Sequence, residues 1–131
     1  MGTRFACTKE APVHEDIKNG IVSSSELDTR LIFRTLRNTA RVLRNAVSDE
    51  VVAMEHRPGG CTFAEIKHLV AGTRGKAAWE SGDLNGGILT AGMVVGLIDD
   101  VPSCEELIER IVHDCHQRLH HAAAYLDLDS R

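Results

Sequence analysis

The chain has 131 residues, of which 43% are apolar and 26% charged, and it carries a formal net charge of −4. This length indicates one ordinary globular domain, and the acidic balance argues against a nucleic-acid surface, which needs clustered Lys and Arg. The longest apolar run, residues 88–98, is about half of a membrane span, and four separated cysteines with neither a CxxC pair nor a signal peptide are typical of reduced thiols in a cytoplasmic protein.

The first half of the chain gives weak helical and strand patterns. Residues 16–24 carry an apolar helical stripe that Gly20 interrupts, and the segment TRLIFRTL (29–36) has the β-branched and aromatic content of a short strand. The following segment, NTARVLRNAVSDEVVAME, spaces its apolar residues as a helix does, with Asn38 or Thr39 as its N-cap. Residues 57–60, RPGG, must end that helix.

Two capping boxes mark helix starts in the second half. TFAE (62–65) begins a short helix that ends at Gly72, and SCEE (103–106) begins a long final helix with a regular apolar stripe. The segment between Gly72 and Gly96 is rich in glycine and shows no clear helical period. The sequence therefore predicts a mostly helical chain with at most two short strands.

The basic residues cluster in the predicted helix and the strand before it. Five arginines follow at spacings of four, three, four and three, namely Arg30, Arg34, Arg37, Arg41 and Arg44. This spacing predicts one helical face, and we interpret it as a solvated stripe beside acidic neighbours rather than as a ligand site.

Histidines crowd the last predicted helix, where His116 and His120 form an i, i+4 pair. Such a pair can bind a transition metal, but no third ligand and no HExxH pattern accompany it. We therefore favour a polar helix end, where histidines suit the C-terminal dipole, and predict no metal site. The segment SGDLNGG (81–87) is interpreted as a turn because it lacks the carboxylates of a calcium loop. No Ser-His-Asp order, Walker loop or GxGxxG appears, so no catalytic residue is assigned.

Three longer strings point to a family. MGTRFACTKEAPVH, DTRLIFRTLRNTARVLRN and GDLNGGILTAGMVVGLIDDVPSCEELIERIV together resemble the C-terminal part of the nitronate monooxygenase (2-nitropropane dioxygenase) family, which is similar to flavin-dependent enoyl-ACP reductases. The resemblance implies an α/β fold: the C-terminal segment of a TIM-like (β/α)8 flavin barrel plus its helical lobe. A complete barrel needs about 250 residues, so we expect an incomplete one. Residues 1–28 would hold the last barrel strand and the helix after it, and residues 29–131 the lobe.

The resemblance also implies site residues. Gly2 and Thr3 match positions that hold the phosphate of FMN, and Met1 lies beside them. Gly92 and Met93, which follow Ala91 in the string AGM, match a segment at the mouth of the active site. An alternative is that Gly92 and Gly96 only permit close packing of the chain.

The family chemistry implied is the FMN-dependent oxidation of alkyl nitronates with O2, in a chain expected to be inactive alone. The family's catalytic histidine would lie outside this sequence, and His14, although near the flavin side, does not match its motif. A complementary N-terminal barrel chain or a homo-oligomer is the expected partner, with no nucleic acid and no membrane. Two alternatives remain open: a non-catalytic helical dimerisation module, and part of a flavin-dependent enoyl-ACP reductase.

Overall fold

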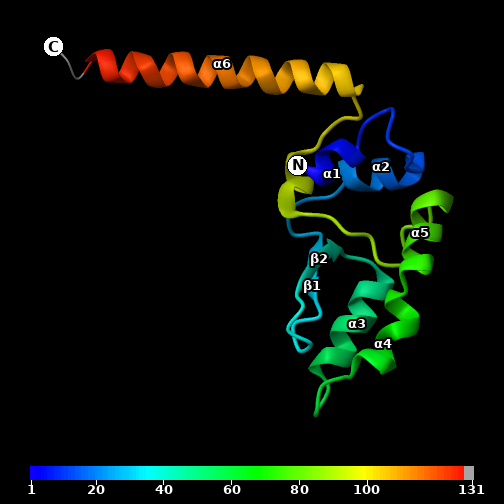
Figure 1. The fold of residues 1–131 in the computed structure, drawn as a ribbon. Helices are drawn as coiled ribbons and strands as arrows, with labels where there is room; N and C mark the ends of the chain where they lie inside the picture. The colour runs from blue at the N-terminus through cyan, green and yellow to red at the C-terminus, as the bar shows by residue number, and fades with distance from the viewer. Residues whose placement is uncertain (129–131) are drawn as a thin grey trace. The chain divides into compact units, whose positions relative to one another are not determined.

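The computed structural model describes residues 1–128 and comprises mostly helices (Figure 1). In chain order the elements are α1 (Gly2–Ala6), α2 (Glu15–Val22), β1 (Thr29–Ile32), β2 (Ala40–Leu43), α3 (Ala46–His56), α4 (Phe63–Val70), α5 (Gly72–Ser81), the 3-10 helix η1 (Met93–Leu97) and α6 (Cys104–Leu128). The chain divides into two compact units, residues 1–101 and the segment from Pro102 onward. The prediction of a mostly helical chain with at most two short strands is confirmed, although only the strand within residues 29–36 lies where it was expected.

The two strands form an antiparallel hairpin. Thr29 pairs with Leu43 and Ile32 with Ala40, so the strand predicted within residues 29–36 is confirmed. The helix predicted from Asn38 is wrong in its first part, because residues 40–43 supply the partner that an isolated strand needs. The five arginines therefore lie on a hairpin and its ends, not on one helical face.

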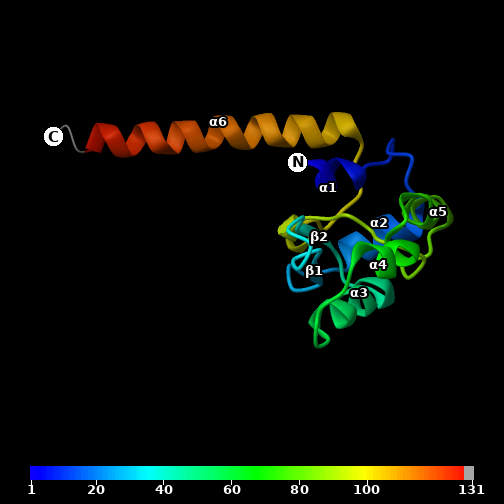
Figure 2. The same cartoon turned by 60° about the horizontal axis from the view of Figure 1, so that its bottom comes forward.

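Helix α3 begins at Ala46, with Asn45 as its N-cap in place of Asn38 or Thr39. The Asn45 side chain accepts a hydrogen bond from Ser48 N at 2.8 Å, and Ser48 Oγ accepts one from Asn45 N at 2.9 Å. This reciprocal capping satisfies amides that a helix start otherwise leaves open. Figures 1 and 2 show α3 packed along the hairpin with α4 beside it, in agreement with the contacts of α3 with β1 and α4.

Two aliphatic clusters form the core of residues 1–101. One joins α2 to the segment around η1, with fully buried Ile17, Ile21, Leu89 and Val95. The other lies between the hairpin and helices α3 and α4, and its fully buried members are Ile32, Val42, Val51 and Ile66. The first cluster therefore packs the segment around η1 against α2, and the second packs the hairpin against α3 and α4.

The start of the chain, where the last barrel strand was expected, folds differently. Residues 2–6 form a short α-helix, not a barrel strand, because no neighbouring strand in the described chain offers them hydrogen-bonding partners.

Helix α5 occupies part of the glycine-rich segment that showed no helical period. The helices that start at the two capping boxes are confirmed as α4 and α6, and none of the helices described in residues 1–128 is both long and apolar enough to cross a membrane.

Candidate functional site

Helix α1 begins directly after Met1, and its first turn presents free backbone amides. The first hydrogen bond of this helix runs from Phe5 N to Met1 O at 3.3 Å, and no side chain caps its start. The amides of Gly2, Thr3 and Arg4 thus have no acceptor among the described residues. A Cβ added at Gly2 would meet no atom within 4 Å, so the surroundings of Gly2 are open.

The start of α1 contacts the start of η1 through Thr3 and Gly92. Thr3 Oγ1 accepts a hydrogen bond from Gly92 N at 3.1 Å, in a partly buried position. The structure therefore brings together the two segments that the family resemblance singled out, although they lie 89 residues apart. The hydroxyl proton of Thr3 remains available to a further acceptor.

The two glycines of the second segment differ in their surroundings. A Cβ at Gly96 would lie 2.7 Å from Glu26 N, so close packing explains this glycine. A Cβ at Gly92 would lie 3.8 Å from the nearest Val94 carbon and 3.9 Å from Thr3 Oγ1, which is ordinary contact. The packing alternative thus holds for Gly96 and does not account for Gly92.

Exposed apolar side chains lie at the N-cap of α1 and on η1. Met1 is 81% exposed and Met93 55% exposed, whereas Ala91 between the two segments is buried. Two more apolar side chains of η1, Val94 and Leu97, are exposed. This surface can therefore take an apolar group next to the open amides.

The side chain of Arg4 is held by contacts with Cys7 and Asp100. Its guanidinium donates to Cys7 O at 3.1 Å and to Asp100 O at 2.9 Å, and it forms an ion pair with the Asp100 carboxylate at 3.2 Å. The Asp100 carboxylate neutralises the charge of Arg4, and these contacts hold α1 against the segment that follows η1. The Arg4 guanidinium is thus committed to the fold.

Cys7 and Lys18 behind α1 are buried and do not form a nucleophilic pair. Burial raises the pKa of the Cys7 thiol, against the lowering effect of Arg4 and Lys18, and its Sγ lies 3.6 Å from Lys18 O. Lys18 Nζ is held by Glu15 at 2.9 Å. A protonated, enclosed thiol is unreactive, so Cys7 is a core residue.

His14 caps α2. Its Nδ1 accepts a hydrogen bond from Asp16 N at 3.2 Å, and its backbone N donates to Trp79 O at 3.0 Å. An imidazole that accepts at Nδ1 carries its proton at Nε2 when neutral. This role accounts for His14 without assigning it to catalysis.

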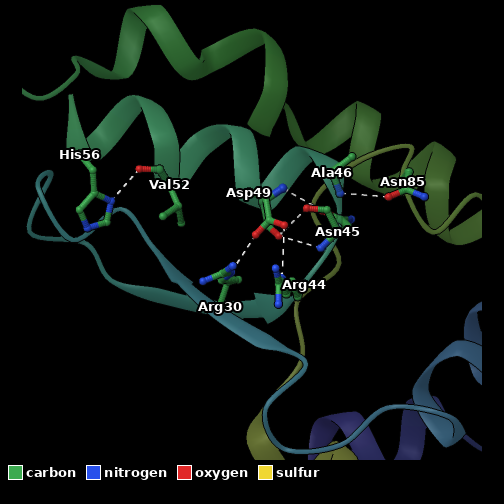
Figure 3. Close-up of polar contacts among 9 residues, drawn as sticks. Arg30, Arg44, Asn45, Ala46, Asp49, Val52, His56 and Asn85 are labelled. Carbon is green, nitrogen blue, oxygen red and sulfur yellow. Dashed lines mark hydrogen bonds and ion pairs between the residues drawn. The ribbon is translucent and has the colours of Figure 1, made fainter.

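The five arginines of the hairpin region differ in whether another side chain binds them. Asp49 binds Arg30 Nε at 2.7 Å and Arg44 Nε at 3.3 Å, as Figure 3 shows. Partial burial raises the pKa of Asp49, but the hydrogen bonds from these two arginines outweigh it and lower the pKa. Arg41 donates to Thr29 Oγ1 at 2.7 Å. The acidic neighbours expected from the sequence are therefore present for two of the five arginines.

The segment SGDLNGG forms a turn, as predicted, that is tied to the start of α3. Asn85 Oδ1 accepts from Ala46 N at 3.0 Å (Figure 3), and Asn45 Nδ2 donates to Leu84 O and Gly87 O at 2.7 and 2.8 Å. The sequence analysis missed these two asparagines, although Asn85 before Gly86 is a common turn signal. On α6, within the described chain, no three His, Cys, Asp or Glu side chains converge as metal ligands.

Comparison with known proteins assigns the chain to a family. The family model for nitronate monooxygenase matches residues 1–114, so the chain belongs to the nitronate monooxygenase family. It is 44% identical, over 97% of its length, to (3aS,4S,5R,7aS)-5-hydroxy-7a-methyl-1-oxo-octahydro-1H-indene-4-carboxyl-CoA dehydrogenase of Mycobacterium tuberculosis. It is 26% identical, over 91% of its length, to the protein of the same name in Rhodococcus jostii.

The fold is also shared with a solved structure. FabK from Thermotoga maritima superposes with a TM-score of 0.84 at 30% identity, over 95% of this chain and 39% of FabK. The chain spans 45% and 43% of the lengths of the two curated relatives. The match thus covers nearly all of this chain and less than half of each relative.

Proposed function

We propose that this chain is part of a flavin-dependent oxidoreductase, in which Gly2 and Thr3 hold the phosphate of FMN and Met1 lies beside it. The observation that carries this proposal is the hydrogen bond between Thr3 and Gly92, which joins both family segments at a surface with open amides. Three backbone amides without an acceptor in the described part of the chain, together with the Thr3 hydroxyl, suit a phosphate.

The residues present fit the phosphate end of the cofactor. The open surroundings of Gly2 leave room for phosphate oxygens against the backbone, and Thr3 Oγ1 is held in place by Gly92 N. Met93 and Met1 offer apolar surface beside the phosphate. FMN, when bound, supplies the acceptor for the two electrons of the oxidation. No side chain described here is assigned as acid or base, and the catalytic histidine of the family has no match in this sequence.

We propose a CoA thioester as the substrate, because both curated relatives are named as dehydrogenases of a carboxyl-CoA compound and one is 44% identical to this chain. The second candidate is the oxidation of alkyl nitronates with O2, which the family name supports. Either activity requires further protein, supplied by a complementary barrel chain or by a homo-oligomer. Gly92 and Met93 would border the substrate.

FMN binding to the chain tests the cofactor site. Two or three charge-assisted hydrogen bonds, each contributing about 1.5–3 kcal/mol, predict weak binding, with dissociation constants in the millimolar range. Equilibrium dialysis should therefore show FMN bound more tightly than riboflavin, which lacks the phosphate. Equal binding of the two flavins would contradict the assignment of Gly2 and Thr3.

A chimaera tests the substrate. In it, this chain replaces the matching segment of the M. tuberculosis relative, and anaerobic bleaching of the flavin is followed after adding a CoA thioester or an alkyl nitronate. We expect bleaching by the thioester. Bleaching by the nitronate alone would move the assignment to the second candidate, and a flavin-loaded chimaera that reacts with neither would overturn both.

A further inference from the structure

The loop between β1 and β2 holds two residues in an unfavourable backbone conformation. Phe33 has φ of 62° and Arg37 has φ of 55°, a region that costs a side-chain-bearing residue about 1 kcal/mol or more. Glu55 of α3 fixes this loop: its Oε2 accepts from Phe33 N at 3.1 Å, and its Oε1 accepts from Thr35 N at 3.1 Å and Thr35 Oγ1 at 2.9 Å. The buried carboxylate thus holds the loop backbone at Phe33 and Thr35 in place.

Phe33 lines two hollows. The larger, of about 370 Å³, lies between the hairpin and α5, and its walls include Phe33, Trp79, Ile88, Lys76 and Thr90. The second, of about 330 Å³, is lined by Phe33, Leu36, Asn38 and Phe63. Because Phe33 is a wall of both, we name them together the Phe33 groove. Its size lies within the range of small-molecule sites.

Positive side chains lie on the wall of the Phe33 groove and on the hairpin loop that carries Phe33. The side chains of Arg34 and Arg37 are exposed on this loop and, in contrast with those of Arg30, Arg41 and Arg44, have no hydrogen-bond or ion-pair partner among the described residues. Neither arginine lines the groove itself, and Arg34 borders a neighbouring hollow with Glu55 and His56. Lys76 on the groove wall is 76% exposed, and its ion pair with Glu80 at 3.7 Å is a weak surface pair. One cation, Lys76, is therefore on the groove wall, and the loop that carries Phe33 adds two more for an anionic ligand that extends beyond the groove.

We propose that the Phe33 groove binds the phosphorylated nucleotide end of a CoA thioester. This inference rests on the proposed function and gives its substrate a binding surface. Phe33 and Trp79 offer aromatic faces on which a purine base can stack, while Lys76, Arg34 and Arg37 bind the phosphates through charge-assisted hydrogen bonds. An apolar ligand would leave these cations unused, and a plain anion would leave the aromatic walls unused.

The test uses the chain as it is, because Trp79 is its only tryptophan. CoA, 3′-dephospho-CoA and pantetheine are titrated while the emission of Trp79 is recorded, and CoA binding is measured in parallel by equilibrium dialysis. We expect a saturable change with CoA, weaker binding of 3′-dephospho-CoA, and no change with pantetheine, which lacks the nucleotide.

Three variants locate the site. Lys76→Gln removes a cation from the groove wall, and Arg37→Gly removes one from the loop while relieving its backbone strain, so this variant should fold at least as stably as the parent chain. Each should weaken CoA binding about tenfold, the loss of one charge-assisted contact. Lys67→Gln on α4 makes the same charge change outside the groove and should leave binding unchanged.

Each of the other outcomes contradicts the proposed CoA site in the Phe33 groove, and the outcomes differ from one another. CoA that binds by dialysis with equal affinity to all three variants places its site elsewhere and leaves the proposed function intact. A loss of affinity in Lys67→Gln equal to that in Lys76→Gln means unspecific attraction of an anion. Absence of CoA binding also overturns the groove, and the substrate is then decided by the flavin-bleaching assay of the chimaera.

Discussion

The imidazole of His14 occupies the space that a side chain at Gly82 would need. A Cβ built on Gly82 falls 2.3 Å from His14 Nδ1, and Gly82 has φ of 84° at the C-terminal end of α5. Because Nδ1 also caps α2, the ring cannot move away without breaking that hydrogen bond. The His14 ring therefore packs on Gly82 at the end of α5 while it caps the start of α2.

We expect Gly82→Ala to lower the free energy of unfolding by about 2 kcal/mol, of which the left-handed conformation accounts for about 1 kcal/mol and the lost cap for the remainder. Urea unfolding followed by Trp79 fluorescence measures this change. Gly72→Ala is the matched control, because its Cβ would meet no atom within 4 Å, and it should be neutral or slightly stabilising. Equal stabilities for the two variants would contradict the role given to His14.

Glu55→Gln should destabilise the hairpin loop. The carboxylate of Glu55 is buried and accepts three hydrogen bonds from Phe33 and Thr35, whereas a glutamine would turn an N–H group toward one of these donors. We expect a loss of about 1.5–3 kcal/mol in unfolding free energy, measured in urea. Glu50→Gln, at an exposed position of the same helix, should change stability by less than about 0.5 kcal/mol.

The capping carboxylate of α4 should make stability depend on acid pH. Hydrogen bonds from Thr62 N, from Arg57 and from the Thr62 hydroxyl lower the pKa of Glu65 from 4.5 to about 2. A lowered folded-state pKa contributes stability above the ordinary value of 4.5 that is lost as the pH falls through the folded value. The stability difference between the parent chain and Glu65→Gln should therefore be constant above pH 5 and shrink toward pH 2.

The comparison of melting temperatures at a series of pH values checks this prediction. Glu50→Gln serves as the control for removal of an exposed carboxylate from a helix. A difference between the parent chain and Glu65→Gln that does not change between pH 5 and pH 2 would show that the negative charge of Glu65 does not stabilise the fold.

Thr3→Val should weaken both the contact between α1 and η1 and the binding of the FMN phosphate. Valine has nearly the shape of threonine but cannot accept from Gly92 N, so we expect a loss of about 1 kcal/mol in stability together with weaker FMN binding. Thr3→Ser keeps the hydroxyl and should restore both. FMN affinity measured by dialysis that is the same in all three proteins would exclude the Thr3 hydroxyl from the phosphate site.

Sequence patterns predicted the elements whose signals are local. Helices α4 and α6 were expected because their caps and apolar stripes lie within the same segment, as in the boxes at Thr62 and Ser103. Helix α2 was expected from its apolar stripe alone, and its cap, His14, was not predicted. Strand β2 was missed because ARVL is a strand only through its pairing with β1. Helix α5 was missed because its glycines weaken the helical pattern, and tertiary packing, with Gly75 close to Ile88 O, outweighs that propensity.

The candidate site was predictable only through the family motifs. They indicated both Thr3 and Gly92, and the hydrogen bond between them gives these residues a common location. The expected barrel strand at residues 2–6 was wrong, since strand formation depends on neighbours that the motif itself does not supply. The Phe33 groove had no sequence signal, because its walls come from the hairpin, α4 and α5, and they meet only in the folded chain.

Helix α6 has a calorimetric consequence. Its residues 108–126 are all exposed, including Ile108, Val112, Leu119 and Leu126, so unfolding this stretch transfers little additional apolar surface to water. Heat-capacity change follows newly exposed apolar surface. The chain should therefore absorb heat on melting with a ΔCp of about 1.2–1.5 kcal/mol/K, the value of a domain of roughly 100 residues, while its far-UV circular dichroism declines over a wider temperature range than the calorimetric peak.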